Sequence, residues 1–138
     1  MVLQILQNGY FEKYCENCYE KYTNADYKWC KSCQRSDLKN NYTNWTSGND
    51  KIDDFIQKKQ LDIYHYSDIV FEWIPYDQFY NNVKEIGKGG FATVYSAIWK
   101  DGPLCFDKKK WIRKSNQRVA LKCFYNSQNI TDEFLNEV

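Results

Sequence analysis

The chain has 138 residues, of which 43% are hydrophobic and 18% are aromatic, and its formal net charge is +1. This apolar content supports a packed core and excludes a wholly disordered chain. The near-zero charge excludes a global field that would favour nucleic acid or an anionic membrane as the partner. The sequence also lacks the run of about 18 apolar residues that predicts a membrane span.

The N-terminal heptapeptide Met-Val-Leu-Gln-Ile-Leu-Gln lacks the basic region and the uninterrupted apolar stretch of a secretory signal. We therefore expect a cytoplasmic protein. Disulfides do not persist in that compartment, so the six cysteines of the chain need another explanation.

Two C-x₂-C pairs stand in the first third of the chain, and they comprise Cys15, Cys18, Cys30 and Cys33. Two thiolates spaced by two residues can hold one tetrahedral metal ion from a tight turn, and two such turns complete four ligands. The pattern predicts a zinc-ribbon-like module over residues 10–46, although the interval between the pairs is shorter than in common zinc fingers. The alternative is a vestigial module whose cysteines stay reduced.

Residues 47–75 are expected to form a linker that contains a short helix. Asn49 or Asp50 can cap this helix. The apolar residues that follow have the i, i+3, i+4 spacing of one helical face, and they are Ile52, Phe55 and Ile56. The apolar stretch 69–74 comes next and is expected to be extended, because Pro75 disfavours helix at the residue before it.

Three strands are predicted in the rest of the chain, over residues 79–86, 92–99 and 119–125. The basic segment Lys108–Arg118 precedes the third strand and carries one tryptophan. A nucleic-acid platform would interleave several aromatic residues with the basic ones, so we expect a solvated, mobile loop. A helix capped by Asn129 or Thr131 is predicted at the end of the sequence.

The turn between the first two strands has the sequence Ile-Gly-Lys-Gly-Gly-Phe-Ala-Thr-Val over residues 86–94. Glycines remove Cβ and let backbone N–H groups approach an anion, so this loop can lie over phosphates. Strand on both sides excludes a Rossmann fingerprint, in which the glycines open a helix. The alternative is an ordinary hairpin turn.

The third predicted strand contains Val-Ala-Leu-Lys over residues 119–122, and Glu137 lies further on in the expected helix. A strand lysine that binds phosphates needs a carboxylate that keeps its amine charged and aimed, and a glutamate on a packed helix supplies one. The alternative is that Lys122 is a surface charge.

Residues 76–138 resemble the N-terminal part of the eukaryotic-type protein kinase domain. The loop is similar to the kinase motif G-x-G-x-x-G-x-V, which is met by Gly87, Gly89 and Val94, with Ala92 at the third glycine. The segment 119–122 resembles V-A-I-K, and Phe-Leu-Asn-Glu-Val at the end of the sequence resembles the segment around the αC glutamate.

This resemblance implies an ATP site in which the loop covers the phosphates. Val94 and Ala120 would pack on the adenine, and Lys122 would contact the α- and β-phosphates. The implied nucleotide-binding residues are Ile86, Gly87, Lys88, Gly89, Gly90, Val94, Ala120, Lys122 and Glu137, the last of which would pair with the lysine. The stretches 45–56 and 71–77 are similar to the extension that precedes the kinase domain in a large group of fungal kinases.

The H-R-D-x-x-x-x-N motif that supplies the kinase base and the D-F-G motif that holds Mg²⁺ do not occur in the sequence. The only histidine, His65, stands in no such context. We therefore expect no catalytic residue, no magnesium ligand and no phosphotransferase activity of the chain on its own. A truncated gene model, a pseudogene or a short product is the expected origin, and a protein substrate is expected only for a full-length form.

Together these features predict an α+β fold, with a zinc-ribbon-like module followed by a partial kinase N-lobe of three antiparallel strands and the start of the αC helix. The expected function is that of a kinase domain fragment that binds ATP through its glycine-rich loop and strand lysine. The alternative is a non-catalytic zinc-binding interaction module with a vestigial nucleotide site.

Overall fold

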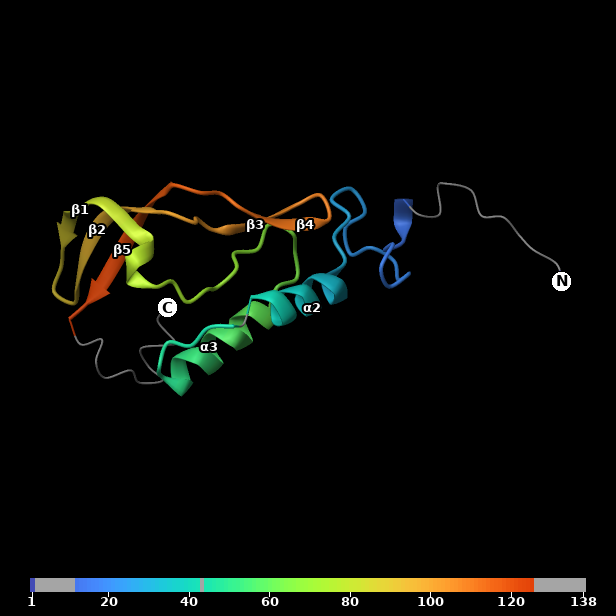
Figure 1. Ribbon diagram of the computed structural model, residues 1–138, viewed down its shortest axis with the longest axis horizontal. Coiled ribbons are helices and arrows are strands. Elements are labelled where there is room, and N and C mark those ends of the chain that lie inside the picture. Colours follow the sequence, from blue (N-terminus) through green and yellow to red (C-terminus); the bar gives the residue numbers. More distant parts are fainter. Residues whose placement is uncertain (2–11, 43, 126–138) are drawn as a thin grey trace.

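The computed structural model describes residue 1, residues 12–42 and residues 44–125, which form an α+β arrangement of helices and antiparallel sheets (Figure 1). In chain order the elements are α2 (Lys31–Asn41), α3 (Asp50–Leu61), the 3₁₀ turn η1 (Tyr76–Gln78), β1 (Phe79–Lys88), β2 (Ala92–Trp99), β3 (Leu104–Asp107), β4 (Lys110–Arg113) and β5 (Gln117–Phe124). The α+β class expected from the sequence is confirmed. The helix expected after Asn129, with Glu137, lies outside the described residues.

A three-stranded antiparallel sheet has the order β1-β2-β5, so the strand that contains the glycine loop's exit lies in the middle. The three predicted strands are confirmed to within a few residues at their ends. In its register, Gly87 of β1 pairs with Val94 of β2, and Val94 pairs with Lys122 of β5. The glycine loop and the strand lysine therefore meet on neighbouring strands.

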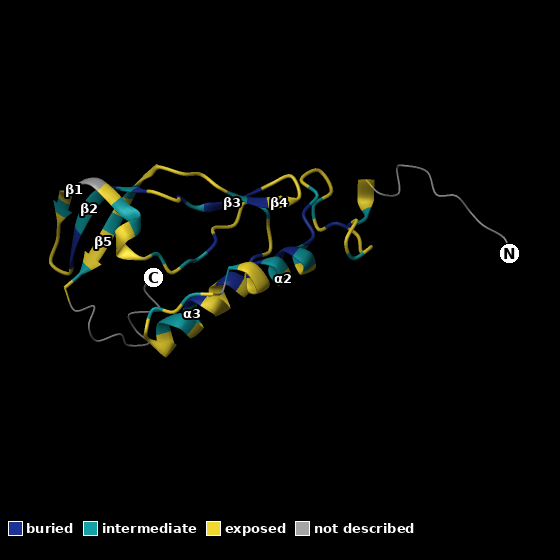
Figure 2. Cartoon of the chain, in the orientation of Figure 1, coloured by how far each residue is buried: buried dark blue, intermediate teal, exposed yellow. Residues whose placement is uncertain are grey.

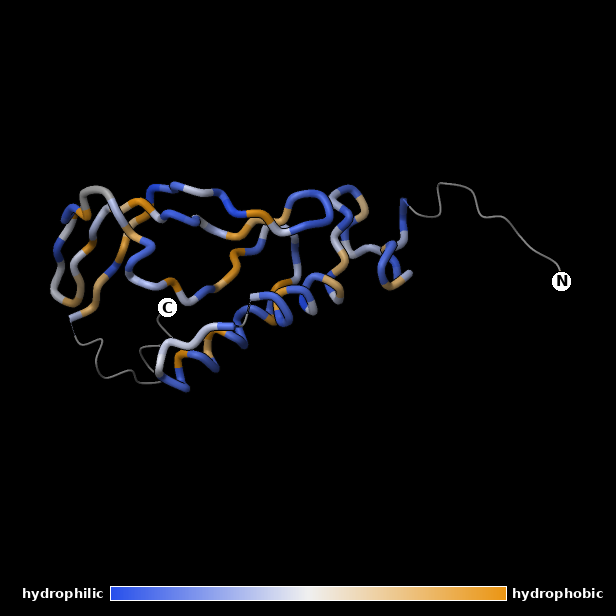
Figure 3. Tube along the Cα trace, in the orientation of Figure 1, coloured by the Kyte–Doolittle hydropathy of each residue, from blue (hydrophilic) through white to orange (hydrophobic). Residues whose placement is uncertain are grey.

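The basic segment before β5 is not the solvated loop that the sequence predicted. Its residues 108–113 form the turn and the second strand of an antiparallel hairpin, β3–β4, which is inserted between β2 and β5. Lys108 and Lys109 form the two-residue connection with φ of 34° and 78°, and Figure 3 shows this hydrophilic turn. Hairpin turns with positive φ usually carry Asn-Gly or Asp-Gly, so a Lys-Lys turn gave no signal in the sequence.

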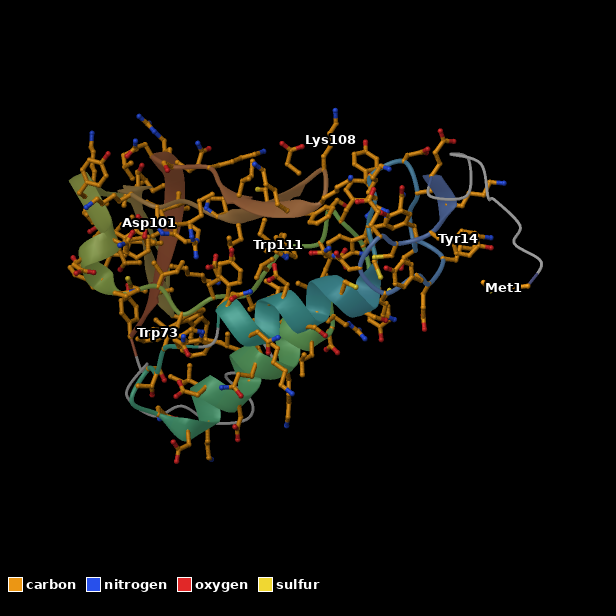
Figure 4. The ribbon with its side chains drawn as sticks, turned by 45° about the vertical axis from the view of Figure 1, so that its right-hand side comes forward. Met1, Tyr14, Trp73, Asp101, Lys108 and Trp111 are labelled. Atoms are coloured by element: carbon orange, nitrogen blue, oxygen red, sulfur yellow. The ribbon has the colours of Figure 1, made fainter. Side chains whose placement is uncertain are left out.

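The inserted hairpin packs into a core that also holds parts of the cysteine module and of the segment around α3. The buried members are Trp29, Leu38, Ile63, Val70, Leu104, Phe106 and Trp111. Figure 2 shows buried stretches in the β3–β4 hairpin and in helix α2. Figure 4 places Trp111 between the hairpin and α2. One apolar core therefore joins segments that are far apart in the sequence.

Helix α2 was not expected from the sequence, because its apolar content is too low for a helical stripe. Its N-cap residue, Cys30, makes no side-chain cap hydrogen bond, and its first turn has no acidic residue. The helix instead buries Gln34 and Leu38, so tertiary packing offsets its weak local propensity.

The expected helix after position 49 is confirmed as α3, and it is longer than the apolar triad suggested. The Asn49 side chain accepts hydrogen bonds from the N–H groups of Lys51 and Ile52, which satisfies two of the free donors at the helix start. Residues 69–74 form no strand. They are instead tied to β4, because Arg113 binds Glu72 with two nitrogens, the shorter contact being 2.6 Å.

No helix in the described part of the chain combines the length and the apolarity that a membrane span requires.

The hairpin packing can be tested at Trp111, which is 8% exposed and makes edge-to-face contacts with Trp29 and Phe106. We expect Trp111→Ala to lower the free energy of unfolding by about 3 kcal/mol or more, because it leaves a cavity in the core. Urea unfolding of the chain measures this. Trp111→Phe should cost much less, because its ring refills the site and removes a buried N–H group that has no acceptor. Equal stability of Trp111→Ala and the surface variant Lys110→Ala would contradict the packing.

Candidate metal centre and nucleotide loop

The first cysteine pair lies in a tight turn of the cysteine module. The N–H group of Cys15 donates to the carbonyl of Glu20 at 2.7 Å, and the N–H group of Tyr19 donates back to the carbonyl of Cys15 at 2.8 Å. Tyr19 adopts a positive φ of 62°, which reverses the chain. These bonds curl the backbone so that Cys15 and Cys18 present their sulfurs to the same side.

The second cysteine pair lies where a small bridge passes into helix α2. Asn24 and Trp29 exchange backbone hydrogen bonds of 3.1 and 2.8 Å, and Cys30 follows directly as the N-cap of the helix. Cys33 is in the first turn. Backbone N–H groups at a helix start carry partial positive charge, which favours thiolates at this place.

The two turns bring the four sulfurs together. Cys15 Sγ lies 3.7 Å from Cys33 Sγ, and Cys18 Sγ lies 3.6 Å from Cys30 Sγ. All four sulfurs lie within 4.8 Å of one another, and none is in a disulfide. A zinc–sulfur bond of about 2.3 Å in tetrahedral geometry requires sulfur–sulfur separations of about 3.8 Å. The cluster therefore has the donor type, number and spacing of a structural zinc site.

The electrostatics of the cluster also favour a cation. Burial raises the pKa of the Cys30 and Cys33 thiols, and the neighbouring sulfurs add to the rise at Cys33. Burial acts in the same direction on Cys15, but the backbone hydrogen bonds of Cys18 and Asn17 together with the side-chain hydrogen bonds of Cys33 and Cys18 outweigh it, and the pKa of Cys15 is lowered. Deprotonation of all four thiols would place four negative charges in this small volume. A divalent cation that replaces the protons offsets their repulsion.

The other two cysteines of the chain do not belong to this cluster. Cys105 lies in β3, and Cys123 is an exposed residue of β5. An open hollow of about 540 Å³ borders the cluster on the side of Cys18 and Cys33, which gives a metal ion or a chelator a path to the sulfurs.

We expect the chain to bind one zinc ion, and Cys33→Ser to lose it, because the serine hydroxyl is a poor replacement for a thiolate. Metal analysis of the purified protein and titration with Co²⁺, whose thiolate complexes absorb visible light, measure the binding. Chelation should unfold the cysteine module, since a structural zinc contributes about 10–16 kcal/mol of apparent binding free energy. Cys123→Ser is the matched control and should keep the metal. A metal content equal in both variants would contradict the assignment.

The zinc affinity should fall as the pH falls, because ligand thiols must lose their protons to bind metal. The sign follows from the raised pKa of Cys30 and Cys33, which keeps both thiols protonated near neutral pH in the metal-free chain. Competition with a chromophoric chelator between about pH 6 and about pH 8 should show a steep rise in affinity. A flat profile would mean that these thiols do not ligate the metal.

The second group of candidate residues lies on the three-stranded sheet. Val94 pairs with Lys122, and Ser96 pairs with Ala120. Residues that pair directly across antiparallel strands point to the same face, as do residues two apart on one strand. Val94, Ala120 and Lys122 therefore share one face of the sheet. Lys122 is exposed, and its Nζ lies 4.9 Å from the ring centroid of Phe124. Its expected partner Glu137 is outside the described residues.

The glycines of the loop are not required by the backbone. Gly87, Gly89 and Gly90 have no positive φ. A Cβ atom on Gly87 or Gly89 would meet its nearest neighbour at an ordinary 3.9 or 3.7 Å, and one on Gly90 would meet nothing within 4 Å. Gly102 is the opposite case, since it has φ of +72° and a Cβ there would lie 1.7 Å from the carbonyl oxygen of Lys114.

Two backbone donors of the loop have no acceptor among the residues that the structure describes. The N–H group of Gly89 donates to the carbonyl of Ala92 at 2.9 Å. In contrast, the N–H groups of Gly90 and Phe91 have no acceptor within the part of the chain that the structure describes. Adjacent free N–H groups in a turn form a concavity that can bind an anion. The loop is exposed, as are Ile86 and Lys88 at its start.

Two residues that no sequence motif marks hold this loop, Thr93 and Tyr125. The Tyr125 hydroxyl donates to the Gly89 carbonyl at 3.0 Å and lies 3.1 Å from the Thr93 hydroxyl. No motif marks either residue, because the contacts depend on how far β5 extends beside the loop.

Comparisons of this chain with protein-family models, with curated proteins and with solved structures find no match. The resemblance to protein kinases therefore stays a prediction.

Proposed function

We propose that the chain binds an adenine nucleotide at the glycine loop between β1 and β2, with Lys122 as a phosphate contact, as the N-terminal part of a kinase-type domain. The observation that carries this proposal is that Gly87, Gly89 and Gly90 stand where neither φ nor packing asks for glycine. A close approach by a ligand to the backbone is the remaining physical reason for three glycines in four residues.

The register of the sheet supports the same proposal. It places the ammonium of Lys122 on the face that also carries Val94 and Ala120, beside the strand that leaves the loop. An apolar valine and a small alanine can accept a flat base, and the lysine can reach the phosphates that follow it. The N–H groups of Gly90 and Phe91, which have no acceptor in the described part of the chain, provide further donors for a phosphate.

The proposal covers nucleotide binding and not phosphoryl transfer, because the sequence holds no H-R-D or D-F-G motif. In this proposal the cysteine cluster has a structural role. A zinc ion there would order the module that carries Trp29, on which the inserted hairpin packs.

A second candidate is a zinc-dependent interaction module without nucleotide binding. The observation that favours it is the cysteine cluster itself, which is complete within the described residues, whereas Glu137, the expected partner of Lys122, lies outside them. Nucleotide binding by the zinc-loaded chain distinguishes the two candidates.

We expect ATP to bind to the zinc-loaded chain, and Lys122→Met to weaken this binding by about tenfold or more, because a charge-assisted contact is worth about 1.5–3 kcal/mol. Isothermal titration calorimetry measures the affinities. Lys100→Met is the matched control, since Lys100 is an exposed lysine in the turn after β2. Equal affinities of the two variants would remove Lys122 from the site.

Substitution of a loop glycine provides a second test of nucleotide binding. Gly90→Ala should fold as stably as the wild type, because its backbone conformation suits alanine, and it should still bind ATP more weakly. Gly102→Ala should instead lose stability. A Gly90→Ala variant with unchanged stability and unchanged ATP affinity would refute close approach of a ligand at this glycine.

A further inference from the structure

Tyr125 follows directly after β5 and is bonded to the glycine loop through both its backbone and its side chain. Its N–H group donates to the Phe91 carbonyl at 3.1 Å. Its hydroxyl donates to the Gly89 carbonyl at 3.0 Å. The side chain is half exposed, with 51% of its surface accessible, so burial of the ring alone does not account for a tyrosine here.

The Tyr125 hydroxyl also makes a hydrogen bond with the Thr93 hydroxyl. A tyrosine hydroxyl has one proton, and this proton is used on the Gly89 carbonyl. The Thr93 hydroxyl, 3.1 Å away, must therefore donate to the Tyr125 oxygen. Thr93 is 6% exposed in the central strand β2, so the end of this hydrogen-bonded chain is anchored in the sheet.

Holding the Gly89 carbonyl has a consequence for the next N–H group. The carbonyl of Gly89 and the N–H of Gly90 belong to one planar trans peptide unit, in which the two groups point in opposite directions. When the carbonyl is drawn toward Tyr125, the N–H of Gly90 is directed away from it. This N–H is one of the two loop donors without an acceptor among the described residues.

We propose that Tyr125 is a positioning residue for phosphate binding: its hydroxyl holds the Gly89 carbonyl and thereby presents the Gly90 N–H group to a phosphate of the nucleotide. This inference rests on the proposed function and adds to it the side chain that orients the loop. Tyr125 itself touches no phosphate, so its effect is transmitted through the peptide unit between Gly89 and Gly90.

The decisive variant is Tyr125→Phe, which removes the hydroxyl and keeps the ring and the backbone bond to Phe91. We expect its affinity for ATP and ADP to fall by about threefold to tenfold, the range of one lost hydrogen bond, while its affinity for adenosine stays unchanged. A merely structural role would weaken the three ligands alike. Tyr80→Phe is the matched control, because it removes a strand tyrosine hydroxyl that is bonded to Asn116 at 2.6 Å, away from the loop.

Thr93 provides an independent check of the same hydrogen-bonded chain. Thr93→Val keeps the side-chain shape without the hydroxyl and should lower the affinity for ATP as Tyr125→Phe does. Thr93→Ser keeps the hydroxyl and should bind ATP as tightly as the wild type. The double variant Tyr125→Phe with Thr93→Val should bind ATP no more weakly than Tyr125→Phe, because both changes break one chain. Additive losses would contradict this linkage.

The amide signal of Gly90 in a nitrogen-labelled sample separates this inference from the proposed function. Titration with inorganic pyrophosphate should shift that signal in the wild type and much less in Tyr125→Phe. If the wild type binds ATP but Tyr125→Phe binds it equally well, the positioning role is overturned and the nucleotide site stands. If pyrophosphate shifts Gly90 as expected but ATP does not bind, the adenine site is overturned and the positioning role stands. No response to either ligand overturns both.

Discussion

The described structure depends on the burial of one tryptophan beside a cysteine of the candidate metal cluster. Trp29 is fully buried and is followed in the chain by Cys30. Its indole N–H group donates to the carbonyl of Tyr64, and its ring makes edge-to-face contacts with Phe106 and Trp111, whose centroids lie 4.7 and 5.7 Å away. The same residue thus contacts the segment after α3 and the inserted hairpin. Any change in the backbone around the cysteine cluster acts directly on this core.

The hairpin is the element through which this core reaches the sheet. The hairpin follows β2 and precedes β5 in the sequence, each through a short connection. These two strands carry Val94 and Lys122. Lys109 at its turn forms an ion pair of 3.0 Å with Glu16, which lies between the first two cysteines. Both partners are about half exposed, so this pair contributes little stability. It places opposite charges where the hairpin turn meets the cysteine module. The apolar contacts of Phe106 and Trp111 are what anchor the insertion.

The glycines of the chain differ in whether the fold requires them. Gly102 is structural, because a side chain there would collide with the backbone of Lys114. The loop glycines have room for a side chain and an ordinary backbone. These glycines therefore cost conformational entropy on folding at positions where the fold does not require glycine. Together with the N–H groups of Gly90 and Phe91, which have no acceptor among the described residues, this is the ground on which we propose an anionic ligand for the segment.

The sequence by itself determined the local features of this protein, namely the cysteine pairs, the strands around the glycine loop, and the helix capped by Asn49. Each has a signal in neighbouring residues, such as spacing, alternation or a cap. Only the tertiary structure decided helix α2, the β3–β4 hairpin and the contacts of Tyr125 with the loop. Helix α2 has no apolar stripe and the hairpin turn has no glycine, so packing around Trp29 rather than local propensity selects them. The Tyr125 contacts depend on the register between β2 and β5, which brings residues more than thirty positions apart into hydrogen-bonding distance.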